Sequence, residues 1–396
     1  MQGLRKKLLF PVLIGLNFFL GFESAGYQMV VLTMSQEFQV GSGTMGLMIA
    51  TQYVAIMLMP LIFGRLSDTW GKKKVLLVSV PLFLLGCAIA VFSKSALVFT
   101  AGIFILGGGY SVSECISGAA LVDANPANAD RSVNTAQFVF SMGAVVSPLI
   151  TAALMNRGFS WRTPFVLCGI GYLILWGLLV LTDIPAPAPA VCQTPEKGNP
   201  LRQVLSTKGF GLLVLAMIVY VSLENGIVYF ADTLFTNELN AAQFGSYAIS
   251  LFWLCMGLSR LLFSLFRYSA EKVVLGCQLC ISLAIAGLAL TRTPVPALVL
   301  FGLAGAFAGP TWPLIFSMAS KSAPAYTGTA SSLMSVSSGF GGALSPSVLG
   351  VMAGAFGMRP SYLLLTLVAL CGFSALLLRR KKLGKEAKEA EETAAS

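Results

Sequence analysis

Long apolar stretches, separated by short polar or charged breaks, dominate the pattern of this chain. A helix needs about 17–25 predominantly apolar residues to cross the hydrocarbon core of a bilayer. Twelve stretches meet this requirement, six on each side of a polar segment near the middle. They lie near residues 8–33, 44–64, 75–93, 96–121, 133–155, 163–182, 209–233, 243–264, 273–291, 295–319, 328–356 and 361–378. Two of the breaks, at residues 93–95 and 291–293, are very short.

Each of these stretches is predicted to be a helix. An apolar segment can cross a membrane only if its backbone hydrogen bonds are satisfied within the protein, which leaves helices and closed barrels. Barrel strands alternate apolar and polar residues, whereas these stretches are continuously apolar. The sequence therefore predicts an all-α membrane protein with twelve transmembrane helices. Composition agrees, because only 11% of the residues are charged, against roughly 25% in soluble domains.

The basic residues are distributed unevenly between the two sides of the predicted bundle. If the N-terminus is cytoplasmic and the helices alternate in direction, 21 of the 26 Lys and Arg residues fall on the cytoplasmic side and 5 on the other. This asymmetry follows the positive-inside rule. It predicts a multi-pass protein of a cell membrane, a bacterial inner membrane, with both termini cytoplasmic. The net charge of +10 then reflects topology and contact with anionic lipids at the cytoplasmic face, not a nucleic-acid partner.

The N-terminal and cysteine patterns do not indicate processing or metal chemistry. The basic residues 5–7 precede an apolar run that is longer than a signal-peptide core and lacks a small-residue cleavage site. We therefore interpret this run as the first transmembrane helix. The eight cysteines lie mostly within predicted spans, and Cys277 and Cys280 have no further ligands nearby. We expect them to pack as small apolar side chains and to bind no metal.

A Pro-rich polar segment divides the chain into two blocks that resemble each other. We predict a first six-helix bundle at residues 1–182, a cytoplasmic linker at 183–208, a second bundle at 209–380 and a cytoplasmic tail at 381–396. Features recur at offsets of 195–201 residues: Glu23 and Glu224, Arg65 and Arg260, Gly143 to Pro148 and Gly341 to Pro346, Phe159 and Phe356, and Arg162 and Arg359. Such offsets indicate a duplication, and duplicated transporters hold their substrate near the midplane between the repeats.

The loop after the second span carries the most specific motif. It reads Gly64-Arg-Leu-Ser-Asp68-Thr-Trp-Gly71-Lys72-Lys73-Lys74. This run resembles the signature loop of the major facilitator superfamily, in which a Gly-x-Leu-x-Asp-x-x-Gly pattern precedes basic residues. The resemblance implies the fold of that superfamily, two six-helix bundles related by a pseudo-two-fold axis. The second-half copy, residues 257–267, keeps basic residues but lacks the aspartate.

Within that superfamily the chain is most similar to the fucose-permease-like branch of fucose, galactose and glucose proton symporters. The stretches that carry this resemblance are Gly107 to Glu114, Asn134 to Gln137, Gly143 to Pro148, Tyr220 to Glu224, Gly309 to Pro313 and Gly341 to Pro346. The resemblance implies an acidic pair in the first and fourth spans, and Glu23 and Glu114 occupy comparable places.

Three glutamates, Glu23, Glu114 and Glu224, lie well inside predicted spans, whereas every basic residue falls at or outside a span end. A charged carboxylate at the bilayer centre costs at least about 2.5–3.5 kcal/mol. Such a group faces water or takes up a proton, so we predict that Glu114 and Glu23 couple transport to protons. Glu114 has the more cavity-like helical face, formed by small and polar residues. Asp232 is expected to be interfacial.

Polar and aromatic residues complete the predicted substrate site. Amides and aromatic rings suit sugar hydroxyls and faces, but they also suit drug-like cations. The predicted substrate-binding residues are Glu23, Gln28, Gln137, Tyr220, Glu224, Asn225, Tyr229, Trp253, Trp312 and Phe316. Trp312 lies between Pro310 and Pro313, where we expect a break in the tenth helix that exposes backbone groups.

The signature loop is predicted to latch the cytoplasmic side. We expect Asp68 to accept hydrogen bonds at the start of the eleventh helix, where unpaired N–H groups favour a carboxylate. Lys72 or Lys73 is expected to meet Asp123 at the end of the fourth helix. The predicted cytoplasmic gate therefore consists of Gly64, Asp68, Gly71, Lys72, Lys73 and Asp123.

These features favour a proton-coupled symporter of a small neutral solute such as a sugar, which binds protons and its substrate and acts as a monomer. The alternative is a proton-coupled exporter of cationic or lipophilic compounds. Exporters carry a longer glycine-rich signature in the fifth span, and here Ser147 stands where that pattern has glycine. A receptor on the same fold is a third class. No nucleophile–base arrangement or phosphate-binding loop indicates an enzyme, and we expect no catalytic residues and no cofactor besides the proton gradient.

Overall fold

The computed structural model describes residues 2–124, 129–184, 200–264, 269–323 and 327–395, and these residues form helices and connecting turns without strands. Twelve segments are long and apolar enough to cross a membrane, which confirms the predicted fold class. The first half contains α1 (Gln2–Glu37), α2 (Ser42–Trp70), α3 (Lys72–Phe92), α4 (Ala96–Ala124), α5 (Ala129–Met155) and α6 (Thr163–Leu181). The second half contains α8 (Phe210–Tyr229), α10 (Gly245–Ser264), α11 (Ala270–Leu290), α12 (Pro294–Ala308), α13 (Thr311–Ser322), α14 (Thr327–Phe356) and α15 (Met358–Ala395).

The short polar breaks separate helices as predicted, since α3 ends at Phe92 and α11 ends at Leu290. The tenth span is divided into α12 and α13, as its two prolines suggested. The remaining short elements are α7 (Pro200–Ser206), within the predicted linker, and α9 (Ala231–Thr233), η2 (Leu234–Glu238) and η3 (Ala242–Phe244), between α8 and α10. The predicted tail continues α15 as a helix to Ala395.

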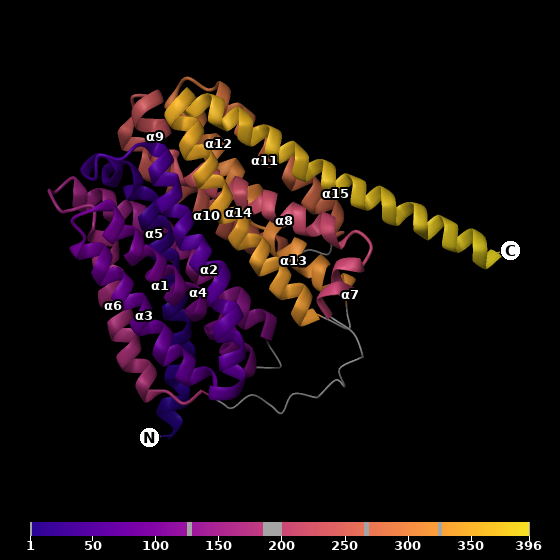
Figure 1. Ribbon diagram of the computed structural model, residues 1–396, viewed down its shortest axis with the longest axis horizontal. Helices are drawn as coiled ribbons and strands as arrows, with labels where there is room; N and C mark the ends of the chain where they lie inside the picture. The colour runs from indigo at the N-terminus through magenta and orange to yellow at the C-terminus, as the bar shows by residue number, and fades with distance from the viewer. Residues whose placement is uncertain (1, 125–128, 185–199, 265–268, 324–326, 396) are drawn as a thin grey trace.

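The two halves stand side by side, with the first half in indigo to magenta and the second in pink to yellow (Figure 1). The chain has twelve spans. Because this number is even, the start of the first span and the end of the last span lie on the same side of the membrane region. We call the side with the N-terminus and α7 the linker end, and the opposite side, with the turns at residues 93–95 and 291–293, the far end. The ribbons of the halves diverge toward the linker end.

Matched glycines pack the helices of each half in the same way. A Cβ atom on Gly143 of α5 would lie 2.0 Å from the Phe18 carbonyl oxygen of α1. A Cβ atom on Gly341 of α14 would lie 2.3 Å from the Ile218 carbonyl oxygen of α8. These approaches tolerate only glycine. Since the two glycines are 198 residues apart, the contacts support the duplication inferred from the sequence.

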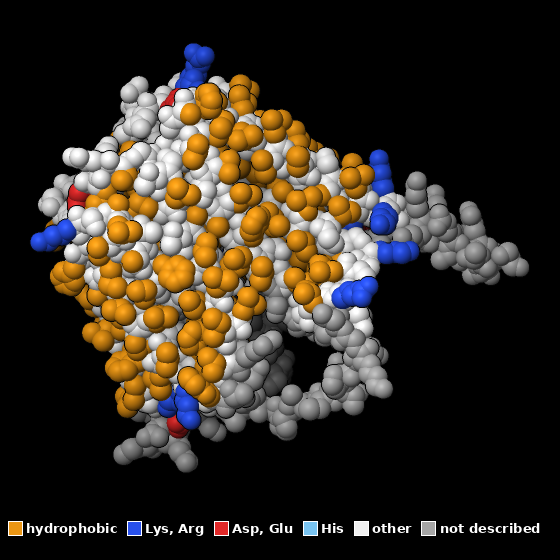
Figure 2. Space-filling model, in the orientation of Figure 1, with side chains coloured by type: hydrophobic (Ala, Val, Ile, Leu, Met, Phe, Trp, Pro, Cys, Tyr) orange, Lys and Arg blue, Asp and Glu red, His pale blue; other side chains and the backbone are white. Residues whose placement is uncertain are grey.

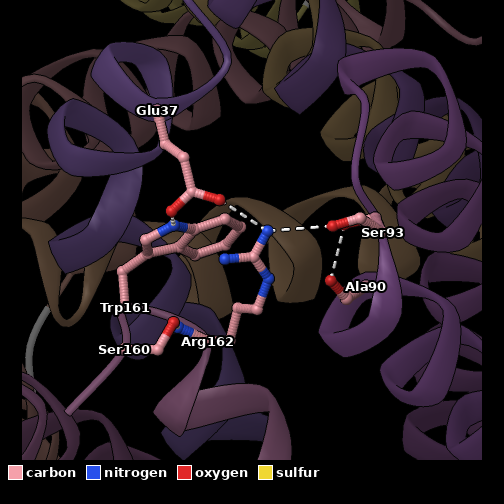
Figure 3. A network of polar contacts seen from close by, with 6 residues as sticks. All are labelled: Glu37, Ala90, Ser93, Ser160, Trp161 and Arg162. Carbon is pink, nitrogen blue, oxygen red and sulfur yellow. Dashed lines mark hydrogen bonds and ion pairs between the residues drawn. The ribbon is translucent and has the colours of Figure 1, made fainter.

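An acid–arginine clasp closes the far end of the first half (Figure 3). Arg162, just before α6, donates to Glu37 at the end of α1 (2.7 Å) and to the Ser93 carbonyl oxygen after α3 (2.9 Å). Trp161 Nε1 donates to the same Glu37 carboxylate (2.6 Å), and the Arg162 guanidinium lies 4.3 Å from the Trp161 ring centroid. The clasp therefore fixes three helix ends relative to one another.

The second half carries a copy of this clasp. Glu238 at the end of η2 accepts a hydrogen bond from the Met358 backbone N–H (2.8 Å) and pairs with Arg359 (3.4 Å). Glu37 and Glu238 are 201 residues apart, the same offset as Glu23 and Glu224. The far end of each half is thus held by an equivalent acid and arginine, which favours movement of each half as one body.

The halves contact each other from the far end to about the middle of the bundle. A Cβ atom on Gly350 of α14 would lie 2.3 Å from the Ser42 carbonyl oxygen of α2, and one on Gly46 would lie 2.0 Å from the Pro346 carbonyl oxygen. Nearer the middle, Gly342 packs against the ring of Tyr53. These close approaches seal the far end between α2 and α14.

Candidate functional site

The three intramembrane glutamates lie within electrostatic range of one hydroxyl group, that of Tyr53. The Tyr53 hydroxyl of α2 interacts electrostatically with Glu23 of α1, Glu114 of α4 and Glu224 of α8. The carboxyls therefore face a common region, although they belong to three helices in two halves. This convergence is the centre of the candidate site.

Glu23 is the most deeply buried of the three, with 1% of its surface exposed. Its two carboxyl oxygens accept from Gln52 Nε2 of α2, at 3.1 and 3.3 Å. The amide oxygen of Gln52 has no hydrogen-bond partner. A carboxylic acid can donate to an amide oxygen as well as accept from its N–H, so this pair can accommodate a protonated Glu23.

Glu114 is half-buried, on a stretch of α4 that contains the buried small residues Ser111 and Ser117. A side-chain hydrogen bond from Gln137 of α5 reaches its carboxyl. The carboxyl also interacts electrostatically with Glu224 and Arg260 of the second half. Glu114, in the first half, therefore interacts electrostatically with charged residues of the second half.

The tenth span breaks at Gly309 and Pro310, between α12 and α13, and the break presents carbonyl groups to the site. Tyr220 of α8 donates its hydroxyl hydrogen to the Ala308 carbonyl oxygen (2.9 Å) and lies within reach of Glu224. The carbonyl of Gly309 would bond residue 313 in a continuous helix, but Pro313 has no N–H. The Gly309 carbonyl oxygen can therefore accept a hydrogen bond from a side chain.

Arg260 of α10 occupies that acceptor, donating Nε–H to the Gly309 carbonyl oxygen (3.1 Å). The side chain is half-buried inside the eighth span, Ala242–Phe263. It interacts electrostatically with Glu224 of its own half and Glu114 of the other half. The expectation that every basic residue falls at or outside a span end is therefore wrong for Arg260. In the sequence Arg260 lies near the end of its span, but its side chain hydrogen-bonds to the break in the tenth span.

Buried polar contacts between the halves close the site toward the far end. Tyr53 donates to Asn225 Oδ1 of α8 in a short hydrogen bond, and Tyr229 hydrogen-bonds to Tyr53. Trp253 Nε1 of α10 donates to Gln28 Oε1 of α1 (3.0 Å). The rings of Tyr27 and Tyr229 pack edge to face, with centroids 5.8 Å apart. We call these groups the far-end seal.

The remaining predicted substrate residues lie on the open side of this seal. Trp312 and Phe316 of α13 are half-buried and stack with centroids 5.0 Å apart. Trp312 Nε1 donates to the Ser338 hydroxyl of α14 (3.1 Å). Exposure to solvent therefore increases from the far-end seal, where Gln28, Tyr229 and Trp253 are buried, to the half-buried pair of Trp312 and Phe316.

The signature loop forms a turn that depends on glycine. Gly71 joins α2 to α3 with φ of 87°, a conformation that other residues rarely adopt. Lys72 donates to the Ala119 carbonyl oxygen near the end of α4 (3.2 Å), whereas Lys73 donates to the Val180 and Thr182 carbonyl oxygens at the end of α6. These cations satisfy carbonyls at helix C-termini. Gly64 and the side chains of Asp68 and Asp123 lie outside the described residues.

Asp232, predicted to be interfacial, is buried in the protein, with 7% of its surface exposed. It lies in α9, between the seventh and eighth spans, and one carboxyl oxygen is 2.2 Å from where a Cβ atom on Gly245 would stand. Burial raises the pKa of Asp232 to about 6. The glycine at the start of α10 leaves room for this carboxyl.

Sequence reasoning missed Gln52, Tyr53 and Arg260 as members of the site. Gln52 and Tyr53 are adjacent in the second span, and neither was among the predicted site residues. A buried amide in such a span needs a hydrogen-bond partner, and this requirement is the signal that could have identified Gln52.

The sequence matches the model of the Major Facilitator Superfamily over residues 13–240 and 212–396. Two curated relatives are each 26% identical: the multidrug resistance protein MdtH of Aeromonas hydrophila over 196 residues, and the MFS antiporter QDR1 of Candida albicans over 181 residues. These matches cover 49% and 45% of this chain and 48% and 36% of the relatives. The chain thus matches less than half the length of either curated relative.

Solved structures of transporters share the fold over nearly the whole chain. The nucleoside transporter NupG has a TM-score of 0.72 at 17% identity, with 94% of this chain and 99% of that chain covered. The Escherichia coli fucose:proton symporter FucP has a TM-score of 0.68 at 19% identity, with 95% and 99% covered. A bacterial homologue of the human lysosomal transporter Spinster, in an inward-facing and unoccupied conformation, has a TM-score of 0.77 at 15% identity, with 96% and 98% covered.

Proposed function

Because the chain belongs to the Major Facilitator Superfamily, we propose that it is a proton-coupled symporter of a small neutral solute, such as a sugar, that works by alternating access. Members of this superfamily are membrane transporters and not enzymes. The observation that carries the proposal is the convergence of Glu23, Glu114 and Glu224 on Tyr53, with Arg260 beside two of them.

Protons are the coupling ion in this proposal. Three carboxylates near the bilayer centre repel one another and lose hydration, and uptake of a proton removes both costs. The chain has no histidine, so a carboxyl is the group that can carry a proton there. Glu114 is assigned this role, because it is half-buried and faces charges of both halves.

Arg260 supplies a link between the proton and the conformation. Ionised Glu114 in the first half attracts Arg260 in the second half, which draws the two halves together near these residues. A proton on Glu114 removes that attraction. Because Arg260 also donates to the Gly309 carbonyl oxygen, the change in charge acts at the break in the tenth span.

The composition of the site favours a neutral, hydroxylated solute over a cation. Arg260 offsets part of the negative charge that would otherwise attract a cation. The stacked Trp312 and Phe316 offer an aromatic face, while Gln137 and Glu224 offer hydrogen-bonding groups for hydroxyls. The fold is also shared with a fucose:proton symporter, and this similarity supports a sugar-like substrate.

The alternative function is proton-coupled export of cationic or lipophilic compounds. The sequence similarity to a multidrug resistance protein and to an antiporter favours this alternative. In that case the same carboxyls would bind the cation, and Arg260 would have to be displaced from them.

We further propose that the linker end is cytoplasmic, in accordance with the positive-inside distribution. The far-end seal then makes this conformation inward-facing.

Uptake by proteoliposomes containing the purified protein tests the proposal. An imposed pH gradient, acidic outside, should drive accumulation of one or more labelled neutral sugars and leave organic cations unaffected. A reversed gradient should abolish accumulation. Efflux of organic cations against inward proton flow, without sugar uptake, would identify an exporter and contradict the proposal.

A further inference from the structure

The outer surface of the second half carries an apolar groove between α8 and α15. Its volume is about 440 Å³. The lining residues are Leu212, Leu215, Leu367, Leu370, Cys371, Ser374, Ala375 and Leu378. Hydrophobic side chains cover much of the face of the molecule drawn in Figure 2, as expected for a surface in lipid, and this groove is a shallow, open concavity. At 1.5 Å per residue, its wall on α15 is about 16 Å long, which suits a hydrocarbon chain lying along the helix.

Two lysines stand on the same helical face, beyond the linker-end limit of the groove. Lys381 and Lys382 follow Leu378 by three and four residues, the spacing of neighbours on one face. Lys382 is also eleven residues after Cys371, which is about three helical turns. The groove therefore leads directly to two positive charges, about 5–6 Å past its last apolar residue.

These lysines are exposed, unlike Arg379, which precedes them on α15. Arg379 is buried and bonds Glu271 of α11 at 2.6 Å, so its charge is already paired. Lys381 and Lys382 are exposed, and neither forms an ion pair with another residue in the part of the chain that the structure describes. Lys and Arg side chains gather near the start of the C-terminal extension in Figure 2.

We propose that this groove and the two lysines form a binding site for one anionic phospholipid. An acyl chain lies along the groove, and the phosphate and its anionic headgroup meet Lys381 and Lys382. A zwitterionic lipid would fill the same groove, but it lacks the net charge that the two lysines attract.

A second copy of the chain fits this surface less well. In a membrane, two copies related by a twofold axis would present the same face at the same depth. Lys381 and Lys382 of both copies would then lie close together at one end of the interface. Like charges repel, whereas an anionic lipid neutralises them, so the charge pattern favours the lipid.

Native mass spectrometry of the full-length protein tests this site, with phosphatidylglycerol and phosphatidylcholine of identical acyl chains as probes. A lysine near an anionic group contributes about fivefold to binding. The double substitution Lys381→Gln and Lys382→Gln should therefore weaken phosphatidylglycerol binding about thirtyfold and leave phosphatidylcholine binding unchanged. Ser374→Phe, which fills the groove and keeps both lysines, should weaken binding of both lipids. Lys74→Gln, at an exposed lysine of the first half, is the matched control and should have no effect.

Thermal unfolding of each variant in lipid-free detergent establishes that the fold is retained. Equal retention of the two lipids by the unmodified protein would overturn the proposal. Unchanged phosphatidylglycerol binding in both the lysine variant and Ser374→Phe would also overturn it. A dimer that Ser374→Phe dissociates would assign the groove to a contact between copies instead.

Discussion

Removal of one hydroxyl group from the far-end seal should open the far end measurably. Tyr53→Phe preserves the ring that packs against Gly342 but removes the donor to Asn225 Oδ1. Asn225 is 5% exposed, so its side-chain oxygen would be left buried without a donor. Leaving a buried acceptor unpaired costs about 1–2 kcal/mol. Because Tyr53 and Asn225 belong to different halves, the substitution destabilises the conformation in which the two halves are in contact at the far end.

This cost translates into a change in population. A destabilisation of about 1–2 kcal/mol raises the ratio of far-end-open to far-end-closed molecules roughly five- to thirtyfold. Val31 is a suitable reporter, because it lines a cavity of about 320 Å³ at the far end and is 3% exposed in this conformation. In a background without native cysteines, the maleimide labelling rate of Val31→Cys should rise by the same factor when Tyr53→Phe is added.

The matched control is Tyr247→Phe, which removes a hydroxyl from an exposed tyrosine of α10. It should leave the labelling rate of Val31→Cys unchanged. Equal rates with Tyr53 and with Tyr53→Phe would refute the argument that this hydrogen bond holds the halves together. A rise of the same size with Tyr247→Phe would show that the effect is not specific to the seal.

Three other substitutions test separate parts of the account. Arg260→Gln should reduce proton-driven accumulation at least about tenfold, whereas Arg260→Lys, which keeps the charge, should retain more of it; equal losses in the two variants would assign Arg260 a structural role. Arg162→Gln should lower thermal stability by about 1–2 kcal/mol, and Arg359→Gln by less, because the Arg359 contact is longer; the reverse order in thermal unfolding would contradict the comparison of the clasps. Burial raises the pKa of Asp232 from 3.8 to about 6, so the folded state holds the proton more tightly and the free energy of unfolding should fall by about 2 kcal/mol as the pH rises from 4 to 6. Asp232→Asn should flatten this part of the stability profile, and an unchanged profile would contradict the assignment of this pH dependence to Asp232.

Much of the fold could be predicted from the sequence, because the bilayer imposes strong constraints on composition. Apolar length alone defined the twelve spans, and the offset between Gly143 and Gly341 indicated the duplication that their matching helix contacts support. The proline pair around Trp312 predicted the broken tenth span. Each of these features depends on local sequence or on a repeat, both of which are visible without coordinates.

The internal geometry of the site could not be predicted in the same way. Whether Gln52 meets Glu23 depends on the rotation of α2 against α1, which packing of the whole half determines. Arg260 is close to a span end in sequence, but its long side chain reaches an acceptor that exists only because Pro313 lacks an N–H. The positions of charged residues in the sequence therefore did not show that Arg260 lies near Glu114 and Glu224.

The role proposed for Glu114, coupling proton movement to transport, can be tested by one comparison in proteoliposomes. Glu114→Gln preserves the shape and hydrogen bonding of the protonated acid but has no proton to release. With a transported sugar, this variant should retain equilibrium exchange at near the unmodified rate and lose accumulation driven by a pH gradient. Accumulation by Glu114→Gln at the level of the unmodified protein would contradict the claim and transfer the coupling role to Glu23.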